Sequence, residues 1–186
     1  GAVTAALHPF QTFAGLDDPG DAASRLSGVT FAVAGRGWTT GFLWELARDL
    51  GGRPVSIADA DRPLYHAAGV MACPQLAALL QAAVEVWQAM GFSAERAVEA
   101  LFPLSRATLE NVASRGVAAS VTGPTVRGDV ATVRSHLEAL FQRLPHLVPL
   151  YGALAGASLP LAARRGVGSG RLSEMQELID HYEGTK

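Results

Sequence analysis

A histidine, a glutamine and a threonine stand close together near the start of the chain, in LHPFQTFAG at positions 7–15. The apolar run over residues 3–7 predicts a short strand that ends at His8. Ligands of open α/β sheets collect at the carboxyl ends of strands, and a histidine there can exchange protons near neutral pH. We therefore predict His8 as a catalytic acid or base, with Gln11 and Thr12 as substrate-binding residues. The alternative is that His8 only bonds backbone groups at the turn.

A second candidate is the connection VTGPTVRGD at positions 121–129, which joins two segments of helical pattern. Its free amides would open a helix, and an arginine stands beside them, a combination that can hold an anion. We predict that Thr122, Gly123 and Arg127 bind the carboxylate or phosphate of a small ligand. The alternative is an ordinary helix start at Asp129, with Arg127 as a surface charge.

A third candidate is the turn after the predicted strand at 29–34, which carries Gly35, Gly37 and Gly41. Dinucleotide-binding turns use such glycines to bring the backbone close to a pyrophosphate, with an acidic residue about twenty positions later. Asp59 and Asp61 stand at that distance. However, the spacing is one residue longer than usual, and two aromatic residues follow where phosphates would need room. We favour the alternative, a strand-to-helix turn that uses glycine for backbone freedom.

The composition argues against several other classes of function. Cys73 is the only cysteine, which prevents an intrachain disulfide and indicates a reducing, cytoplasmic setting. The histidines lack metal-ligand spacing, so no metal is expected. A net charge of −2 gives no basic surface for nucleic acid. The apolar stretch 146–163 is long enough for a membrane, but its prolines, glycines and alanines favour packing against protein, so no membrane is expected.

The first third of the chain predicts the elements that position His8 and the glycine turn. Strands are expected at 29–34 and 54–58, with a helix over 40–50 between them. This order is typical of a βαβ unit with parallel strands. The sheet pattern stops there, so residues 1–59 are predicted as a partial α/β domain, the C-terminal part of a Rossmann-like domain.

The rest of the chain predicts helices. They are expected at 64–90, 93–115, 129–144, 147–164 and 173–182. Pro74 should kink or restart the first of them, and Pro103 should break the second. Tyr65 and His66 are interpreted as core or interface residues. The expected N-caps are Asp61, Ser93 and Asp129.

The last helix is expected to begin with a capping box formed by Ser173 and Gln176. Its apolar face needs a surface, either the body of the chain or a second subunit. We predict a helical dimerisation and substrate domain at 60–165, and a linker with a C-terminal helix at 166–186.

Three stretches of sequence together resemble a known family. They are LHPFQTFAG, DRPLYHAAGVMA at 61–72, and PLSRATLENVASRGVAASVTGPTVRGDVATVRSHLEAL at 103–140. They resemble Rossmann-like NAD(P)-dependent oxidoreductase-like proteins with a C-terminal helical domain of unknown function. These proteins are relatives of pyrroline-5-carboxylate reductase and of the 6-phosphogluconate dehydrogenase C-terminal-like domain. The resemblance covers residues 5–160.

The resemblance implies an α/β segment, the end of a Rossmann-like sheet, followed by an all-α 6-phosphogluconate dehydrogenase C-terminal-like domain. That domain would form a homodimer interface and part of the active-site cleft. The 121–129 connection is similar in position to the substrate-carboxylate loop of pyrroline-5-carboxylate reductases. His8 and Pro9 resemble the His-Pro turn of prephenate dehydrogenases, where the histidine faces the substrate.

The chain departs from this family in two places. The family carries its first strand and phosphate-binding glycines ahead of the His-Pro segment, and this chain does not contain them. NADP or NAD is therefore expected in the full-length relative, with no tight binding to this chain. Position 74 is proline where the resemblance implies asparagine. Because Gly1 stands where a methionine would open a gene, we expect a fragment or a natural truncation.

Three functional hypotheses follow. The first is the substrate-binding and dimerisation part of an NAD(P)-dependent oxidoreductase acting on a small carboxylate-bearing substrate, not catalytic as this chain alone. The second is a non-catalytic helical dimer module that binds a small ligand or a partner. The third is a small nucleotide binder that uses Gly35–Gly41.

Overall fold

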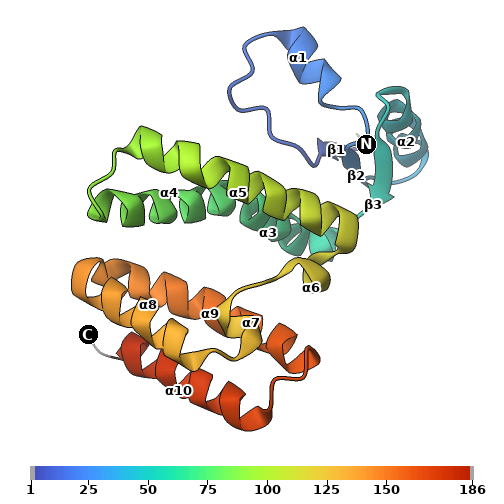
Figure 1. The fold of residues 1–186 in the computed structure, drawn as a ribbon. Coiled ribbons are helices and arrows are strands. Elements are labelled where there is room, and N and C mark those ends of the chain that lie inside the picture. The colour runs from blue at the N-terminus through green and yellow to red at the C-terminus, as the bar shows by residue number, and fades with distance from the viewer. Residues whose placement is uncertain (1–2, 185–186) are drawn as a thin grey trace. The chain divides into compact units, whose positions relative to one another are not determined.

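The computed structural model of the chain describes residues 3–184. It is mostly helical, with one three-stranded sheet near the N-terminus (Figure 1). The chain forms two compact units, residues 1–78 and residues 79–186. The change from strands to helices comes inside the first unit, where the short 3₁₀ helix η1 (Asp59–Asp61) begins. The predicted division into three domains stays a prediction.

The sheet contains β1 (Ala6–Pro9), β2 (Thr30–Ala34) and β3 (Arg53–Ser56), in that order. The strands β2 and β3 are parallel and are joined by α2 (Trp38–Asp49), which confirms the predicted βαβ unit. Their buried side is closed by Val29, Phe31 and Ala47. The helix α1 (Pro19–Ser24) lies on the connection from β1 to β2.

The direction of β1 corrects one expectation. It runs antiparallel to β2, with Ala6 opposite Ala34 and Pro9 opposite Phe31. His8 therefore lies inside β1, toward the end of the sheet where β2 begins, rather than at the carboxyl ends of the parallel strands. The long connection that contains α1 allows this reversal, and the apolar pattern of a short strand carries no information on its direction.

Pro74 separates two helices, as predicted. The helix α3 (Arg62–Ala72) ends at Cys73, whose backbone leaves the helical region with φ −124° and ψ −84°, and α4 (Pro74–Ala89) starts next. The expected cap at Asp61 is wrong, because its side chain accepts no hydrogen bond from the helix. The reason is that η1 runs directly into α3, so the Asp61 backbone is already helical.

The second unit continues from α4 with a succession of helices. They are α5 (Ala94–Arg115), α6 (Val117–Ser120), α7 (Pro124–Arg127), α8 (Val130–Arg143), η2 (Pro145–Leu147), α9 (Val148–Arg164) and α10 (Ser169–Gly184). Ser93 and Asp129 cap α5 and α8 through their side chains, as predicted. The connection 116–129, expected as a loop, instead contains α6 and α7.

Two predicted helix boundaries are wrong. Pro103 lies inside a continuous α5, because it sits on an exposed face where water can satisfy the carbonyl that loses its partner. Ser173 and Gln176 do not form a capping box, because α10 already begins at Ser169. The Gln176 side chain donates instead to the Asp180 carboxylate at 2.7 Å.

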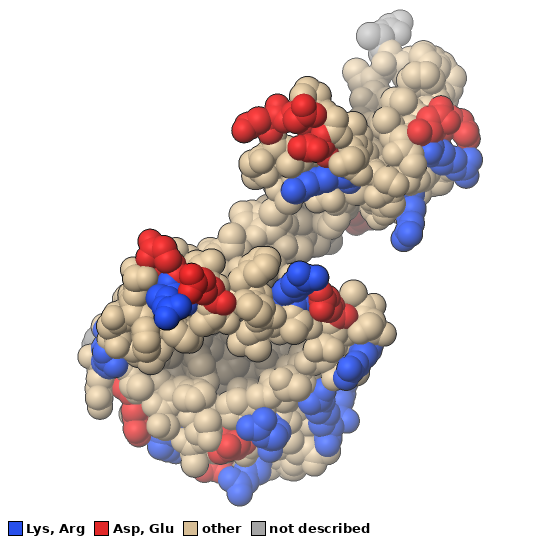
Figure 2. Space-filling model, turned by 45° about the horizontal axis from the view of Figure 1, so that its top comes forward, with Lys and Arg blue, Asp and Glu red and all other residues tan. Residues whose placement is uncertain are grey.

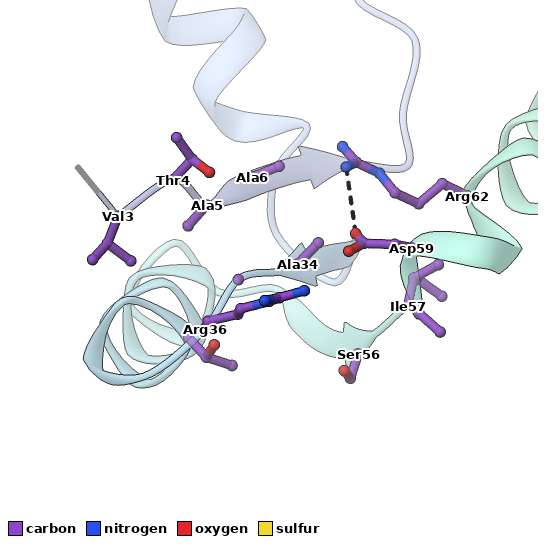
Figure 3. A pocket seen from close by; sticks show the side chains of 13 residues that line it. Val3, Thr4, Ala5, Ala6, Ala34, Arg36, Ser56, Ile57, Asp59 and Arg62 are labelled. Carbon is purple, nitrogen blue, oxygen red and sulfur yellow. Dashed lines mark ion pairs between the residues drawn. The ribbon is translucent and has the colours of Figure 1, made fainter. Parts of the chain in front are cut away.

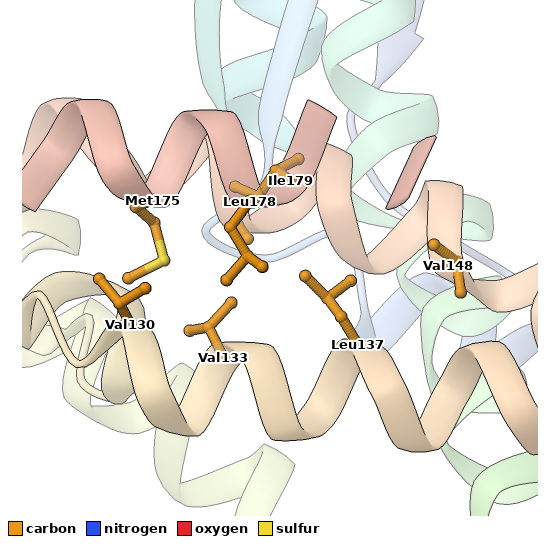
Figure 4. Close-up of a cluster of buried hydrophobic side chains, with 8 residues drawn as sticks. Val130, Val133, Leu137, Val148, Met175, Leu178 and Ile179 are labelled. Carbon is orange, nitrogen blue, oxygen red and sulfur yellow. The ribbon is translucent and has the colours of Figure 1, made fainter. Parts of the chain in front are cut away.

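The core of the second unit lies between α8, α9 and α10 (Figure 4). Val133 and Leu137 of α8 face Leu178 and Ile179 of α10, and all four are fully or almost fully buried. The apolar face of α10 is therefore buried against its own unit. Of the two surfaces that the sequence analysis considered for this face, it packs on the body of the chain and not on a second subunit.

Two segments are long and apolar enough to cross a membrane by length and composition, Asp59–Ala89 and Pro145–Arg164. The second of them contains α9, whose Val148, Gly152 and Ala155 are buried in the second unit. This segment contains the apolar stretch 146–163, which the sequence analysis predicted to pack against protein. The first segment contains α3 and α4 and is much less buried.

Candidate functional site

One face of the sheet is built from small side chains and one histidine. Alternate residues of a strand point to the same face, and the pairing of β1 with β2 sets Ala6 opposite Ala34 and His8 opposite Ala32. Alanines leave space above the sheet, and α3 covers that space. The resulting pocket of about 250 Å³ is lined by Ala6, His8, Ala32, Ala34, Ile57, Arg62, Tyr65 and His66.

His8 and Tyr65 form a hydrogen-bonded pair in this pocket. The His8 Nδ1 lies 3.0 Å from the Tyr65 hydroxyl, and the two rings meet edge to face. The Phe10 ring packs on the other side of Tyr65, with the ring centres 4.8 Å apart. Burial raises the pKa of the Tyr65 phenol, which keeps its proton at neutral pH. The phenol can therefore donate to Nδ1 and leave the proton of a neutral His8 on Nε2.

The pocket continues toward the end of α3. A neighbouring space of about 450 Å³ shares His8 and His66 with it. This second space is also lined by Phe10, Gln11, Thr12, Gly69, Val70, Ala72, Cys73 and Pro74. The structure thus brings together His8, Gln11 and Thr12, the three residues predicted from the first motif.

In the other direction the pocket opens at the carboxyl ends of β2 and β3. A cleft of about 960 Å³ there shares Ala6, Ala34, Ile57 and Arg62 with the His8 pocket. Arg36 enters it from the turn after β2, and Arg62 enters from the start of α3 (Figure 3). An Arg62 guanidinium nitrogen lies 3.7 Å from the Asp59 carboxylate. We call these three neighbouring spaces, which share lining residues, the α3 groove.

The structure explains why two of the three candidate glycines, Gly35 and Gly37, are glycine. A Cβ on Gly35 would lie 3.0 Å from the Cβ of Ala5, and Gly37 has a φ of +63°. Gly41 needs neither room nor unusual backbone, because a Cβ there meets nothing within 4 Å. Trp38 and Phe42 project from the start of α2, 73% and 59% exposed. The reasons at Gly35 and Gly37 and the aromatic side chains beside them favour the ordinary-turn explanation.

Thr122, Gly123 and Arg127 belong to the second unit. Gly123 precedes α7 with a φ of +113°, and Arg127 closes the same short helix. Arg127 lines a separate open pocket with Gly128 and Asp129 that includes neither Thr122 nor Gly123. The α3 groove of the first unit therefore contains none of these three residues.

Sequence reasoning missed three residues of the α3 groove. Arg62, Tyr65 and His66 lie on the helix face that covers the sheet, at the spacing of three and four residues typical of one helical face. The sequence DRPLYHAAG shows this spacing, but it does not show which element this face of α3 packs against. Within residues 3–184 no group of three or more His, Cys, Asp and Glu side chains could hold a metal ion.

The fold is shared with two larger proteins of known structure. Protein TM1727 from Thermotoga maritima is 20% identical, with a TM-score of 0.75, over 87% of this chain and 62% of that one. BF3122 from Bacteroides fragilis, described as a candidate NADP oxidoreductase, is 18% identical, with a TM-score of 0.67, over 84% of this chain and 57% of that one. The chain thus spans less than two thirds of either protein.

At these identities the likeness shows the fold alone, an α/β part followed by helices. No curated protein matches the chain.

The model of one protein family matches residues 29–158, which is more than half of the chain. The matched region runs from the sheet through α3 to α9, so it includes the helical side of the α3 groove but begins after His8. The chain belongs to the DUF2520 family, which is described as a domain of unknown function.

Proposed function

We propose that this chain is the substrate-binding and dimerisation part of an NAD(P)-dependent oxidoreductase-like protein, and that its α3 groove holds a small carboxylate-bearing substrate. The observation that carries the proposal is the His8–Tyr65 hydrogen bond inside a pocket also lined by Arg62. A proton-exchanging group and a cation then face the same small space, which suits a substrate with a carbonyl and a carboxylate.

Each groove residue has a chemical role in this proposal. Arg62 pairs with the substrate carboxylate, in place of its long contact with Asp59. In this step His8 is protonated: its Nδ1–H donates to the Tyr65 hydroxyl oxygen, and its Nε2–H passes to the substrate carbonyl oxygen as the carbonyl is reduced, which leaves a neutral ring. Gln11 and Thr12 supply hydrogen bonds at the far end of the groove. A nicotinamide cofactor bound elsewhere in the whole oxidoreductase would supply the hydride.

Thr122, Gly123 and Arg127 remain a proposed anion site in the second unit. The kinship with pyrroline-5-carboxylate reductase and 6-phosphogluconate dehydrogenase is also part of the proposal. It is supported by the shared order of an α/β part followed by helices.

The test uses pyruvate as a small 2-oxo carboxylate probe and follows the histidine ring resonances by NMR. The chain has five histidines, of which His8 and His66 line the α3 groove. We expect pyruvate to shift these two and leave the other three unchanged. Arg62→Gln should weaken binding about tenfold, since it removes one charge-assisted hydrogen bond.

Arg48→Gln is the matched control for that substitution. Arg48 also pairs with an acidic residue three positions earlier on an exposed helix of the same unit, but it lies outside the groove. Equal losses for the two variants, or shifts spread evenly over all five histidines, would remove the groove as the substrate site.

We further propose that the helical part forms a homodimer. Val98, Phe102 and Leu109 lie along α5 at helical spacing and are 52%, 63% and 55% exposed. Side chains of this size are rarely left in water as a contiguous stripe. Wide areas of the surface in Figure 2 also carry neither acidic nor basic side chains. The same apolar surface of α5 would also form the interface if the chain is a non-catalytic dimer module, the second hypothesis from the sequence.

Sedimentation velocity over a range of concentrations tests the dimer. Phe102→Ser should raise the dimer dissociation constant by tenfold or more, because burying a phenylalanine contributes about 1.5–3 kcal/mol. Phe42→Ser is the control, since Phe42 is equally exposed but lies on α2. A wild-type chain that stays monomeric at the highest concentration contradicts the proposal. If the dimer forms but pyruvate does not bind, the non-catalytic module is favoured.

A further inference from the structure

A second open pocket lies where α7, the α9–α10 connection and the first turn of α10 meet. It has a volume of about 650 Å³. Its lining consists of Val126, Arg127, Gly128, Asp129, Arg165, Gly166, Val167, Gly168 and Arg171. Three arginines therefore come from three separate segments, and glycines make up much of the remaining wall.

The backbone at the end of α7 packs closely against the connection between α9 and α10. Gly128 has a φ of +69°, and a Cβ there would lie 2.8 Å from the Cγ1 of Val167. Val126, which also lines the pocket, is 3% exposed. The α7 end and the α9–α10 connection are thus packed on each other, which holds the stems of Arg127 and Arg171 beside a common space.

The positive charge in this pocket is only partly balanced within the protein. The Arg127 side chain forms no ion pair or hydrogen bond with a residue between 3 and 184, and its charge acts on the nearby Asp129 carboxyl. Arg165 donates to the carbonyl of Ala118 at 2.8 Å. Arg171 lies 4.0 Å from the Glu174 carboxylate, and its charge also acts on the Asp129 carboxyl.

Asp129 is the one carboxylate in the lining, and both of its oxygens also accept hydrogen bonds from Thr132. Oδ1 accepts from the Thr132 amide at 3.1 Å, and Oδ2 accepts from the Thr132 hydroxyl at 2.7 Å. Three arginines against one aspartate leave the lining with a net charge of +2 (3 − 1). Like charges gathered in one space repel one another unless an anion joins them.

We infer that Arg127, Arg165 and Arg171 bind a phosphate group, either free or on a small organic molecule. Guanidinium groups that approach from three segments match the three terminal oxygens of a phosphate, whereas a carboxylate is satisfied by one forked arginine. This inference deepens the anion site proposed around Arg127 and rests on that part of the proposed function: it names Arg165 and Arg171 as the partners of Arg127. None of the three arginines lines the α3 groove, so the inference does not depend on pyruvate binding there.

The test is a titration of the whole chain with inorganic phosphate, followed through backbone amide resonances at constant ionic strength. We expect saturable shifts at Gly128, Gly166 and Gly168, and little effect of acetate. Arg127→Gln and Arg171→Gln should each weaken phosphate binding about fivefold to tenfold, because each removes one charge-assisted contact. Arg134→Gln is the matched control, an exposed arginine of α8 outside the pocket.

A second titration with phenyl phosphate separates the two sources of the phosphate group. Tighter binding of phenyl phosphate than of inorganic phosphate assigns the pocket to an organic phosphate, and the reverse order assigns it to the free ion. Acetate shifts as large as those of phosphate would overturn the inference. Equal losses in Arg134→Gln and Arg171→Gln would also overturn it. None of these results bears on pyruvate binding at His8, so the two proposals can fail separately.

Discussion

At the scale of single residues, two hydrogen-bonded histidine–tyrosine pairs lie in different surroundings. His8 pairs with Tyr65 in the α3 groove, and His136 pairs with Tyr151 across α8 and α9 at 2.8 Å. Burial raises the pKa of both phenols. The chemistry of the pairs is the same, so the groove around His8 is what makes only that pair a candidate for catalysis.

Tyr65→Phe should free the His8 ring while preserving the packing against Phe10. Without the phenol, the Nδ1 and Nε2 tautomers of His8 should become more equally populated in nitrogen NMR spectra. Pyruvate affinity should fall about threefold to tenfold, since one hydrogen bond no longer orients the ring. Tyr151→Phe should change His136 alone. If it alters His8 as strongly, the argument for a local pair is contradicted.

Asp129 should make the stability of the second unit depend on pH. Hydrogen bonds from Thr132, and then the nearby Arg127 and Arg171, hold the pKa of its carboxyl below the usual value. A depressed pKa in the folded state stabilises the protein above the unfolded value of about 3.9, and this contribution is lost as pH falls through the folded pKa. Asp129→Ala should therefore lower the unfolding midpoint at neutral pH, with a smaller effect below pH ~3. A loss independent of pH would show that the carboxylate charge plays no part.

At the scale of elements, the start of β3 is fitted against the ring of a core phenylalanine. A Cβ on Gly52 would collide with the ring of Phe31, which is 2% exposed, and would lie 2.9 Å from the Val29 carbonyl oxygen. This close approach brings β3 onto β2. It also fixes the carboxyl ends where the α3 groove opens.

Gly52→Ala should destabilise the first unit by about 1–3 kcal/mol, as overpacked cores do. Gly41→Ala is the informative comparison, because its Cβ meets nothing and it lies within α2. That substitution should stabilise the helix by about 0.5–1 kcal/mol. Denaturant unfolding of both variants measures the difference. A cost at Gly41 would contradict the ordinary-turn explanation and would revive the nucleotide-binding alternative.

At the scale of the whole molecule, each unit has its own buried cluster. The first is centred on Phe31 and the second on Leu137, and both side chains are almost completely removed from water. The substrate proposal rests on the first unit, whereas the dimer and phosphate proposals rest on the second. A substitution that destabilises one core should therefore affect only the binding or dimerisation proposed for that unit.

Leu137→Ala should lower the unfolding free energy of the second unit by about 2–5 kcal/mol, because it leaves a cavity between α8 and α10. Hydrogen exchange should accelerate for the amides of α8 and α10 and stay unchanged for those of β2. Pyruvate binding at His8 should survive. Equal acceleration in β2 would show that the two cores unfold together.

The sequence by itself determined those elements that depend only on residues close together in the chain. The βαβ unit, the restart at Pro74 and the caps at Ser93 and Asp129 follow from periodicity and from side chains bonding their own backbone. It also placed His8, Gln11 and Thr12 in one candidate site, because they are neighbours along the chain.

Only the tertiary structure decided the direction of β1, the continuity of α5 through Pro103 and the partners of the candidate residues. Tyr65 meets His8 across 57 positions of sequence, and Arg127 shares its pocket with Arg165 and Arg171 rather than with Thr122. Periodicity shows which side of a helix is apolar, but not which surface that side meets. The composition of each site therefore depends on packing between distant segments, for which one sequence carries no local signal.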